Sequence, residues 1–230
     1  YSYVNAGAPV GSDAITVGFL YKGSVVGLSD VVDILDSDNS ISDENGPLFN
    51  TLKNRPAMSQ KFALVENGQE IVISVNHLKS KSKGSGCGAG DDDTTDGQGN
   101  CNGTRTRAAT ALVAHLAQNF TDLPTLIIGD LNSYAKEQPI TTITAAGYTN
   151  LVEQFQGAEA YSYTFRGELG YLDHALGNNQ LLDKVVDVTE WHINADEPIV
   201  LDYNVEFQTE AQQTNLYAPD QYRMSDHDPV

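Results

Sequence analysis

Four short polar clusters in the sequence combine imidazole, carboxylate and amide side chains. Aspartate and asparagine offer the hard oxygen ligands that suit Mg²⁺, Mn²⁺ or Ca²⁺, and imidazoles transfer protons near neutral pH. Together these groups could activate a water, neutralise the charge on a phosphoryl group and protonate a leaving oxygen, as hydrolysis of a phosphodiester requires. The clusters are Asn76-His77, Asp130 with Asn132, Asp173-His174, and Asp226-His227-Asp228.

Each cluster also has an interpretation without catalysis. Asp130 could cap a turn, as aspartate and asparagine often do. His77 could be a core histidine bonded to a backbone carbonyl, and Asp226 could cap a turn before Pro229. Asp173, however, lies within an apolar run, where an unpaired charge is costly. Four such costs at strand ends are explained more easily by one shared polar site.

The clusters lie at the ends of predicted strands. Asp130 and Asn132 follow a short apolar run, and side chains two apart on an extended segment point the same way. Asn67-Gly68 predicts a tight hairpin, and the polar segment 24–54 is expected to be mostly loop. Strands are predicted at Ala14–Tyr21, Lys61–Glu66, Ile71–Val75, Thr125–Ile128, Tyr171–Leu176 and Val185–Ile193, and helices at Thr106–Phe120 and Gln138–Ala146. This alternation indicates a layered α/β architecture.

Length and composition are those of a single globular domain over residues 1–230. No apolar run is long enough to span a bilayer, and no segment resembles a signal peptide, as expected of a mature or excised piece. The formal net charge of −18 gives no support for a basic face that binds nucleic acid. Either metal ions or another part of the protein bind phosphate, or the substrate is not a nucleic acid. The sequence contains no Gly-rich phosphate loop, Cys-x-x-Cys pair or nucleophilic serine elbow that would support a covalent or cofactor mechanism.

Two cysteines, Cys87 and Cys101, enclose a polar loop rich in glycine, aspartate and asparagine. The pair predicts a disulfide and an oxidising compartment; two unpaired thiols are the alternative. Within the loop, Asp91–Asp96 could bind a structural Ca²⁺, but the run does not fit the EF-hand pattern, and a solvated charge run is the simpler interpretation. Lys79 is the first of three alternating lysines before the loop, which could contact phosphate or simply be solvated.

Four motifs, N-H-L-K-S, G-D-L-N-S, Y-L-D-H-A-L and S-D-H-D-P, resemble those of the exonuclease–endonuclease–phosphatase (deoxyribonuclease I-like) superfamily. The sequence looks closest to the secreted nucleases of bacteria within it. G-D-x-N followed by S-D-H-x-P is the specific signal, and the resemblance runs from about Ile15 to the end of the chain. It implies an α/β (α+β) fold, a four-layered αββα sandwich of two packed mixed sheets flanked by helices, with the site at one end of the sheets.

The resemblance also implies catalytic roles for these residues. His227, paired with Asp173, would act as the general base or orient the attacking water. His77 would protonate the leaving group or stabilise the phosphoryl oxygens. Asp130 and Asn132 would position the water and the phosphate beside a Mg²⁺ or Mn²⁺ ion.

Further residues are implied as metal ligands and substrate contacts. Asp226 would be a metal ligand, together with Asp130 and Asn132. Arg55, in N-R-P-A-M, matches a contact of the superfamily to the substrate phosphate. Asn76 is a further candidate for contact with the substrate.

One departure from the superfamily concerns the principal metal ligand. An early strand there carries an asparagine, and the next carries a glutamate, often after glutamine; both precede the segment that resembles Ala14–Tyr21. The opening stretch of this chain contains no Gln-Glu, and Gln69-Glu70 falls at the hairpin turn. The domain is therefore expected to lack its first strands and the metal-binding glutamate. An adjoining N-terminal segment would supply them, and the 230 residues alone would have weak or absent activity.

We therefore expect a secreted, metal-dependent nuclease that hydrolyses phosphodiester bonds of DNA, with RNA as a second candidate substrate. One alternative is a phosphodiesterase or phosphatase that acts on lipid head groups or small phosphate esters, because fold does not decide among these activities. Another is a non-catalytic, acidic extracellular binding domain. The missing glutamate supports the binding domain, whereas histidines and aspartates at strand ends oppose it.

Overall fold

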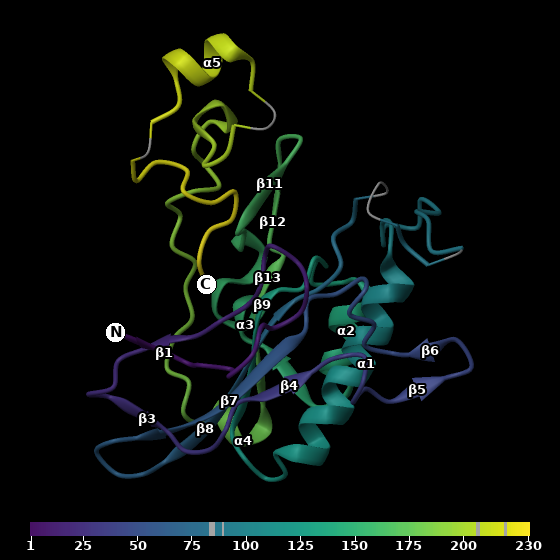
Figure 1. Cartoon of the computed structure of the whole chain (residues 1–230), viewed down its shortest axis with the longest axis vertical. Coiled ribbons are helices and arrows are strands. Elements are labelled where there is room, and N and C mark those ends of the chain that lie inside the picture. The colour runs from purple at the N-terminus through teal and green to yellow at the C-terminus, as the bar shows by residue number, and fades with distance from the viewer. Residues whose placement is uncertain (83–85, 89, 206–207, 219) are drawn as a thin grey trace.

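A seven-stranded mixed sheet forms the centre of the fold (Figure 1). The computed structural model describes residues 1–82, 86–88, 90–205, 208–218 and 220–230. The strand order is β10-β13-β9-β8-β7-β3, and β4 also pairs with β7. Among these described strands, β8 and β9 are parallel and the other neighbours are antiparallel. The strands are β3 (Val26–Leu28), β4 (Asp33–Leu35), β7 (Ala57–Leu64), β8 (Glu70–His77), β9 (Thr125–Asp130), β10 (Tyr148–Asn150) and β13 (Asp173–Asn178).

The β7–β8 hairpin forms at the predicted Asn67-Gly68 turn. The Asn67 side chain accepts a hydrogen bond from the backbone N–H of Gln69 at 3.0 Å. Gly68 has a φ of +72°, a conformation that favours glycine. Both strands are longer than the sequence pattern predicts, and pairing with β9 extends β8 to His77.

Helices α1 (Asn102–Asn119) and α2 (Gln138–Ala145) cover one face of the sheet. Apolar residues recur along α1 at three- and four-residue spacing, so a stripe that includes Leu112 and Leu116 packs in one cluster with Ile127 of β9. Both predicted helices are confirmed. Over the described ranges, no helix combines the length and apolar character needed to cross a bilayer. The shorter helices are α3 (Leu151–Gln156), α4 (Asn179–Leu182) and α5 (Glu210–Asn215), with 3-10 turns at Gly157–Glu159 and Ile199–Leu201.

Extended segments cover much of the opposite face. β1 (Ser2–Tyr3) and β2 (Leu20–Tyr21) form a two-stranded antiparallel sheet. The segment leading into β2 packs on β7 through Phe19, whose ring meets the Phe62 ring edge-on with centroids 5.6 Å apart. The predicted α/β fold of packed sheets and flanking helices is confirmed, with two strands in the second sheet among the described residues.

Two of the predicted strands are wrong. Within Ala14–Tyr21, only the last two residues join a ladder, because the segment bends around 11–15 and is held by packing of Val17 and Phe19 rather than by strand pairing. Val185–Ile193 forms no strand. Val185 and Val188 pack into the cluster beneath α3, whereas Val186 and Trp191 are exposed, so the apolar pattern reflects partial burial without strand pairing.

The polar segment 24–54 is more ordered than predicted. It contributes β3 and β4 to the large sheet and also forms a separate two-stranded ribbon, β5 (Ser42–Asp43) with β6 (Gly46–Pro47). A second ribbon, β11 (Tyr163–Phe165) with β12 (Glu168–Gly170), precedes β13. Both ribbons consist of two or three residues per strand, too short to give a clear alternation of apolar side chains.

Candidate active site

Strand pairing places His77, Asp130 and Asp173 in one row across the sheet. β8 runs parallel to β9 with His77 opposite Asp130, and β13 runs antiparallel with Asp173 opposite Asp130. Paired residues on neighbouring strands project to the same face, so the three side chains meet at the edge where β8 and β9 end. The His77 Nε2 atom lies 3.3 Å from Oδ2 of Asp130. Three predicted catalytic residues are therefore adjacent.

The neighbouring row, Asn76, Gly129 and His174, faces the helices instead, because residues of a strand alternate between faces. Asn76 is 1% exposed, and its side-chain amide donates to Ser74. The His174 Nε2 atom lies 2.7 Å from the backbone oxygen of Ser133. Of each adjacent pair, His77 and Asp173 lie in the row, whereas Asn76 and His174 are buried on the helix side of the sheet. Contact of Asn76 with substrate stays a prediction, since the structure does not bring its side chain to the row.

Gly129 allows β8 and β9 to approach each other beside the row. Its φ is +116°, and a Cβ atom there would lie 2.1 Å from the backbone oxygen of Asn76. We expect Gly129→Ala to destabilise the fold by about 3 kcal/mol through backbone strain and steric overlap, as measured by chemical denaturation. Gly147→Ala is the matched control, because Gly147 has a φ of +96° and open space around it. An equal loss of stability for the two substitutions would show that the short distance between Gly129 and the Asn76 backbone oxygen is not what requires glycine.

His227 completes the group from the C-terminal segment. Its Nδ1 atom lies 2.6 Å from Oδ2 of Asp173, and the same oxygen accepts a hydrogen bond from the Ser162 hydroxyl at 2.7 Å. The His227 ring packs on the Tyr163 ring with centroids 4.6 Å apart, and an antiparallel bridge joins the two backbones. Because Nδ1 is bonded to Asp173, Nε2 is the His227 nitrogen that can act on a substrate or water.

Burial and charge give these groups very different pKa values. Burial, with the positive charge of Arg55, lowers the pKa of His77 to about 4. Burial and the charge of Asp173 raise the pKa of Asp130 to about 7. Burial opposes protonation of His227, but the hydrogen bond and charge of Asp173 outweigh it and raise the pKa of His227 to about 9. From these groups alone, His227 is protonated at neutral pH and His77 is neutral.

Asn132 and Asp226 flank the row. Asn132 has a φ of +48°, and this turn directs its backbone N–H and its side-chain amide toward the two oxygens of Asp130, at 2.7 and 3.0 Å. Asp226 is close enough for its negative charge to raise the pKa of both Asp130 and His227. All five residues predicted as catalytic therefore belong to one neighbourhood, and Asp226 lies next to them.

Arg55 is the better placed of the two basic residues predicted to bind substrate. Its backbone N–H donates to the His77 carbonyl at 3.3 Å, and its guanidinium lies 3.4 Å from the carboxylate of Asp13. Lys79 is buried, and its Nζ donates to the hydroxyl of the following serine; burial lowers the pKa of this lysine. Lys83, the third of the alternating lysines, lies outside the described residues.

The donor atoms suit a divalent cation. Among the described residues, Asp130, Asp173 and His227 offer ligand atoms that all lie within 4.8 Å of one another. The mutual repulsion of the two carboxylates contributes to the raised pKa of Asp130, and a cation beside them would offset it. The group fits a hard ion such as Mg²⁺ or Mn²⁺. Of the three predicted metal ligands, Asp130 belongs to this group, and Asn132 and Asp226 lie next to it.

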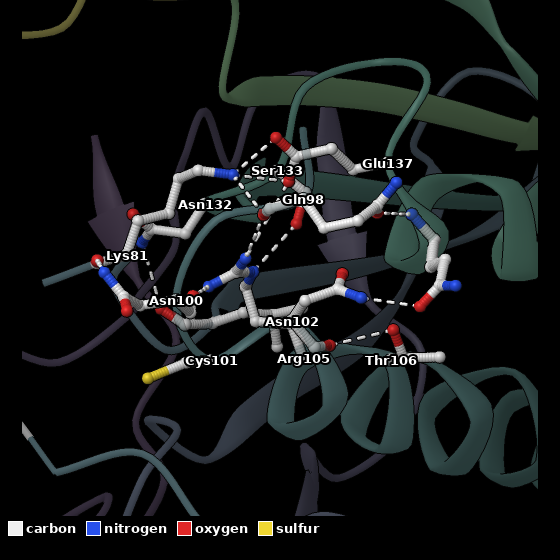
Figure 2. A network of polar contacts seen from close by, with 12 residues as sticks. Lys81, Gln98, Asn100, Cys101, Asn102, Arg105, Thr106, Asn132, Ser133 and Glu137 are labelled. Atoms are coloured by element: carbon white, nitrogen blue, oxygen red, sulfur yellow. Dashed lines mark hydrogen bonds and ion pairs between the residues drawn. The ribbon is translucent and has the colours of Figure 1, made fainter. Parts of the chain in front are cut away.

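A buried polar network supports the loop that follows Asp130 and carries Asn132 and Ser133 (Figure 2). Its centre is Arg105 of α1, which is 0% exposed and links the loops after β8 and β9 to the disulfide loop. Its guanidinium donates to Oγ of Ser133 (3.0 Å) and to the backbone oxygens of Lys79 (3.2 Å), Asn100 (2.8 Å) and Gln98 (3.3 Å). Glu137 lies 3.8 Å from Arg105 and pairs with Lys81. The sequence pattern does not predict this network, although an arginine on the apolar stripe of α1, as Arg105 is, indicates a buried charge with partners.

Cys87 and Cys101 form the predicted disulfide, with Cα atoms 4.9 Å apart. Within the loop that they close, Asp91 accepts hydrogen bonds from the backbone N–H groups of Gly103 and Thr104, both at 2.7 Å. This carboxylate therefore caps the first turn of α1, which explains why the helix begins earlier than its apolar periodicity predicts. A Ca²⁺ site in the acidic loop stays a prediction.

His174 makes the stability of the fold depend on pH. Burial lowers its pKa from 6.5 to about 4, so the folded imidazole stays neutral while the unfolded chain binds a proton below pH 6.5. The free energy of unfolding therefore decreases as the pH falls from 6.5 to 4, by up to ~1.4 kcal/mol per pH unit from this group. Urea denaturation at a series of pH values should show that the free energy of unfolding of His174→Gln depends less steeply on pH than that of the unchanged protein. Identical slopes for the two proteins would contradict this account.

Comparisons with known proteins give structural matches only. No family model matches the sequence, and no curated protein matches it. The catalytic domain of human Nocturnin with bound sulfate is 14% identical, with a TM-score of 0.47, over 67% of this chain and 49% of that one. A mannosyl-6-phosphatase of Bacteroides thetaiotaomicron is 13% identical, with a TM-score of 0.48, over 69% and 55%. D. rerio TDP2 complexed with a single-stranded DNA product is 14% identical, with a TM-score of 0.44, over 74% and 59%.

The chain thus spans between 49% and 59% of the length of these three solved structures. All three TM-scores are below 0.5, so the assignment of function depends on the site itself.

Proposed function

We propose that this chain is the catalytic portion of a divalent-metal-dependent phosphodiester hydrolase of the exonuclease–endonuclease–phosphatase superfamily, and that its substrate is DNA. The observation that carries the proposal is the row of His77, Asp130 and Asp173, closed by His227 at 2.6 Å from Asp173. Two adjacent, largely buried carboxylates are costly for a purely structural domain, and the raised pKa of Asp130 is typical of functional sites. The motif resemblance supports the same assignment.

The residues of the row can perform the proton transfers that hydrolysis needs. A water attacks phosphorus and loses a proton as the new P–O bond forms, while the bond to the leaving oxygen breaks and that oxygen gains a proton. We assign His227, oriented by Asp173, to the attacking water and His77 to the leaving or phosphoryl oxygens. The negative charge of a bound phosphate raises the low pKa of His77, as protonation of a leaving oxygen requires. A Mg²⁺ or Mn²⁺ ion held by Asp130 with Asp173 or Asp226 would, when bound, neutralise charge on the phosphoryl oxygens.

The assignment of His227 as the base has a condition. Its pKa must fall from about 9 toward neutrality before it can accept a proton efficiently. The negative charges of Asp173, Asp130 and Asp226 hold this pKa up, so added positive charge beside these carboxylates acts in the required direction. A bound cation would therefore have two effects: it would lower the pKa of His227, and it would neutralise charge on the substrate.

Secretion and the choice of DNA are supported by different features. The disulfide is typical of an oxidising compartment, and N-H-L-K-S resembles the secreted bacterial nucleases. The net charge of −18 opposes strong binding of a polyanion, so a lipid head group or a small phosphate ester is the second candidate substrate, with RNA as a further polynucleotide candidate.

We also propose that these 230 residues hydrolyse phosphodiesters slowly. Their opening stretch contains no Gln-Glu that would supply a further metal ligand.

The test is release of acid-soluble nucleotides from plasmid DNA by this chain with Mg²⁺, Mn²⁺ or EDTA. We expect slow hydrolysis with Mg²⁺ or Mn²⁺ and none with EDTA. Hydrolysis of a phosphate monoester or a lipid phosphodiester in place of DNA would favour the second candidate substrate. Failure to hydrolyse any of the three, with no heat of Mg²⁺ binding, would favour a non-catalytic binding domain.

A further inference from the structure

The motif S-D-H-D-P contains a second carboxylate, Asp228, that the proposed chemistry does not use. Asp228 is 1% exposed. Its Oδ2 atom lies 2.9 Å from Nδ1 of His192, and its Oδ1 atom accepts three hydrogen bonds from successive backbone N–H groups. These donors are Ile193 (3.0 Å), Asn194 (2.8 Å) and Ala195 (2.9 Å). Successive backbone N–H groups that converge on one anion form a nest, a strong fixed site for negative charge.

The nest connects Asp228 to the backbone of His227. Asn194, which is buried and donates its backbone N–H to Asp228, also donates its side-chain amide to the carbonyl of His227 at 2.8 Å. The N–H of Trp191 donates to the Pro229 carbonyl at 2.9 Å. The loop 191–195 therefore holds the chain on both sides of Asp228 and fixes the backbone from which the His227 ring projects.

Asp228 is connected to Asp173 through Ser162. The backbone N–H of Asp228 donates to the carbonyl of Ser162 at 2.8 Å. The hydroxyl of Ser162, a buried residue, donates to Oδ2 of Asp173 at 2.7 Å. That oxygen is the one bonded to His227. Both members of the His227–Asp173 pair are therefore anchored to one residue.

We propose that Asp228 is a positioning residue for the His227–Asp173 pair. Its side chain fixes the loop 191–195, which holds the His227 backbone, and its main chain fixes Ser162, which orients Asp173. Asp228 does not contact substrate, because it is buried and both of its oxygens already have partners. The inference rests on the proposed function for its effect on rate, whereas its effect on the geometry of the pair is independent of any activity.

The test uses Asp228→Asn, which preserves size but removes the charge and half of the acceptor capacity of the side chain. The Nδ1–H proton of an imidazole bonded to a carboxylate gives a strongly downfield proton NMR signal, assigned here by its loss in His227→Ala. We expect Asp228→Asn to shift or broaden this signal and to lower kcat about 10- to 100-fold, the effect of misplacing a catalytic group, with KM nearly unchanged. Asp196→Asn is the matched control; Asp196 is exposed next to the same loop and, within the part of the chain that the structure describes, its side chain bonds to the Tyr161 hydroxyl.

A second variant covers the case in which Asp228→Asn fails to fold. Asn194→Ala leaves the backbone nest intact and removes only the side-chain bond to the His227 carbonyl. We expect a several-fold loss of kcat and a smaller shift of the same NMR signal. A folded Asp228→Asn protein with an unchanged imidazole signal would overturn the proposal. A shifted signal in a protein without hydrolase activity would keep the positioning role and reject the proposed function instead.

Discussion

Replacing His227 with alanine is expected to lower the rate of DNA hydrolysis by about three orders of magnitude, within the range of 10²–10⁴ that a general acid or base contributes. Among the described residues of the site, only His227 has an imidazole that a hydrogen bond to a carboxylate both orients and makes more basic. The ring is largely buried against Tyr163, so the substitution removes some packing as well. Initial rates with saturating Mg²⁺, together with a thermal melt, separate the two effects.

A matched control is available in the same chain. His115 of α1 and Asp33 of β4 form another largely buried His–Asp pair, away from the row. His115→Ala should leave the rate within about twofold, although it removes a similar interaction. The double variant His227→Ala with Asp173→Asn should be little slower than His227→Ala alone, because residues that act as a unit are not additive. Multiplicative losses, or a slow His115→Ala enzyme, would contradict the assigned pair.

The row could be predicted from sequence because strand patterns there are strong. His77 and Asp130 each end an apolar run, and Asp173 begins one, so their location at one sheet edge follows from the chain itself. What the sequence does not contain is the register. Register decides that His77 faces the site while Asn76 faces the helices, and a shift of one residue would exchange them.

Other features have no local signal in the sequence. Ser162 orients Asp173 from the position just before a short ribbon whose residues show no periodicity, and this ribbon places Tyr163 against His227. Val185–Ile193 has the composition of a strand, but Val185 and Val188 are partly buried beneath α3 without a ladder partner. Strand propensity mainly reflects a preference for half-buried surfaces, so tertiary packing overrode it here.

Arg105→Met is expected to reduce the free energy of unfolding by about 3–5 kcal/mol, the typical effect of breaking a buried charged network. The guanidinium has no exposure to solvent, and its hydrogen bonds reach the loop of Ser133, the strand end at Lys79 and the disulfide loop. Methionine fills a similar length without a donor, so the backbone oxygens of these segments lose their partner away from water. Urea denaturation monitored by circular dichroism measures the loss.

The control for Arg105→Met is the same substitution two residues further along α1. Arg107 pairs with Asp43, and their side chains are 31% and 41% exposed, so water replaces the lost contact and the cost should stay within about 1 kcal/mol. Both substitutions replace an arginine of the same helix by methionine, so charge and helix propensity change equally. The difference between the two losses in free energy of unfolding therefore reports the effect of burial. Equal costs would mean that water reaches the Arg105 network. A large cost confined to Arg105→Met, with slower DNA hydrolysis, would show that the disulfide loop and the loop after Asp130 are stabilised by the same buried cation.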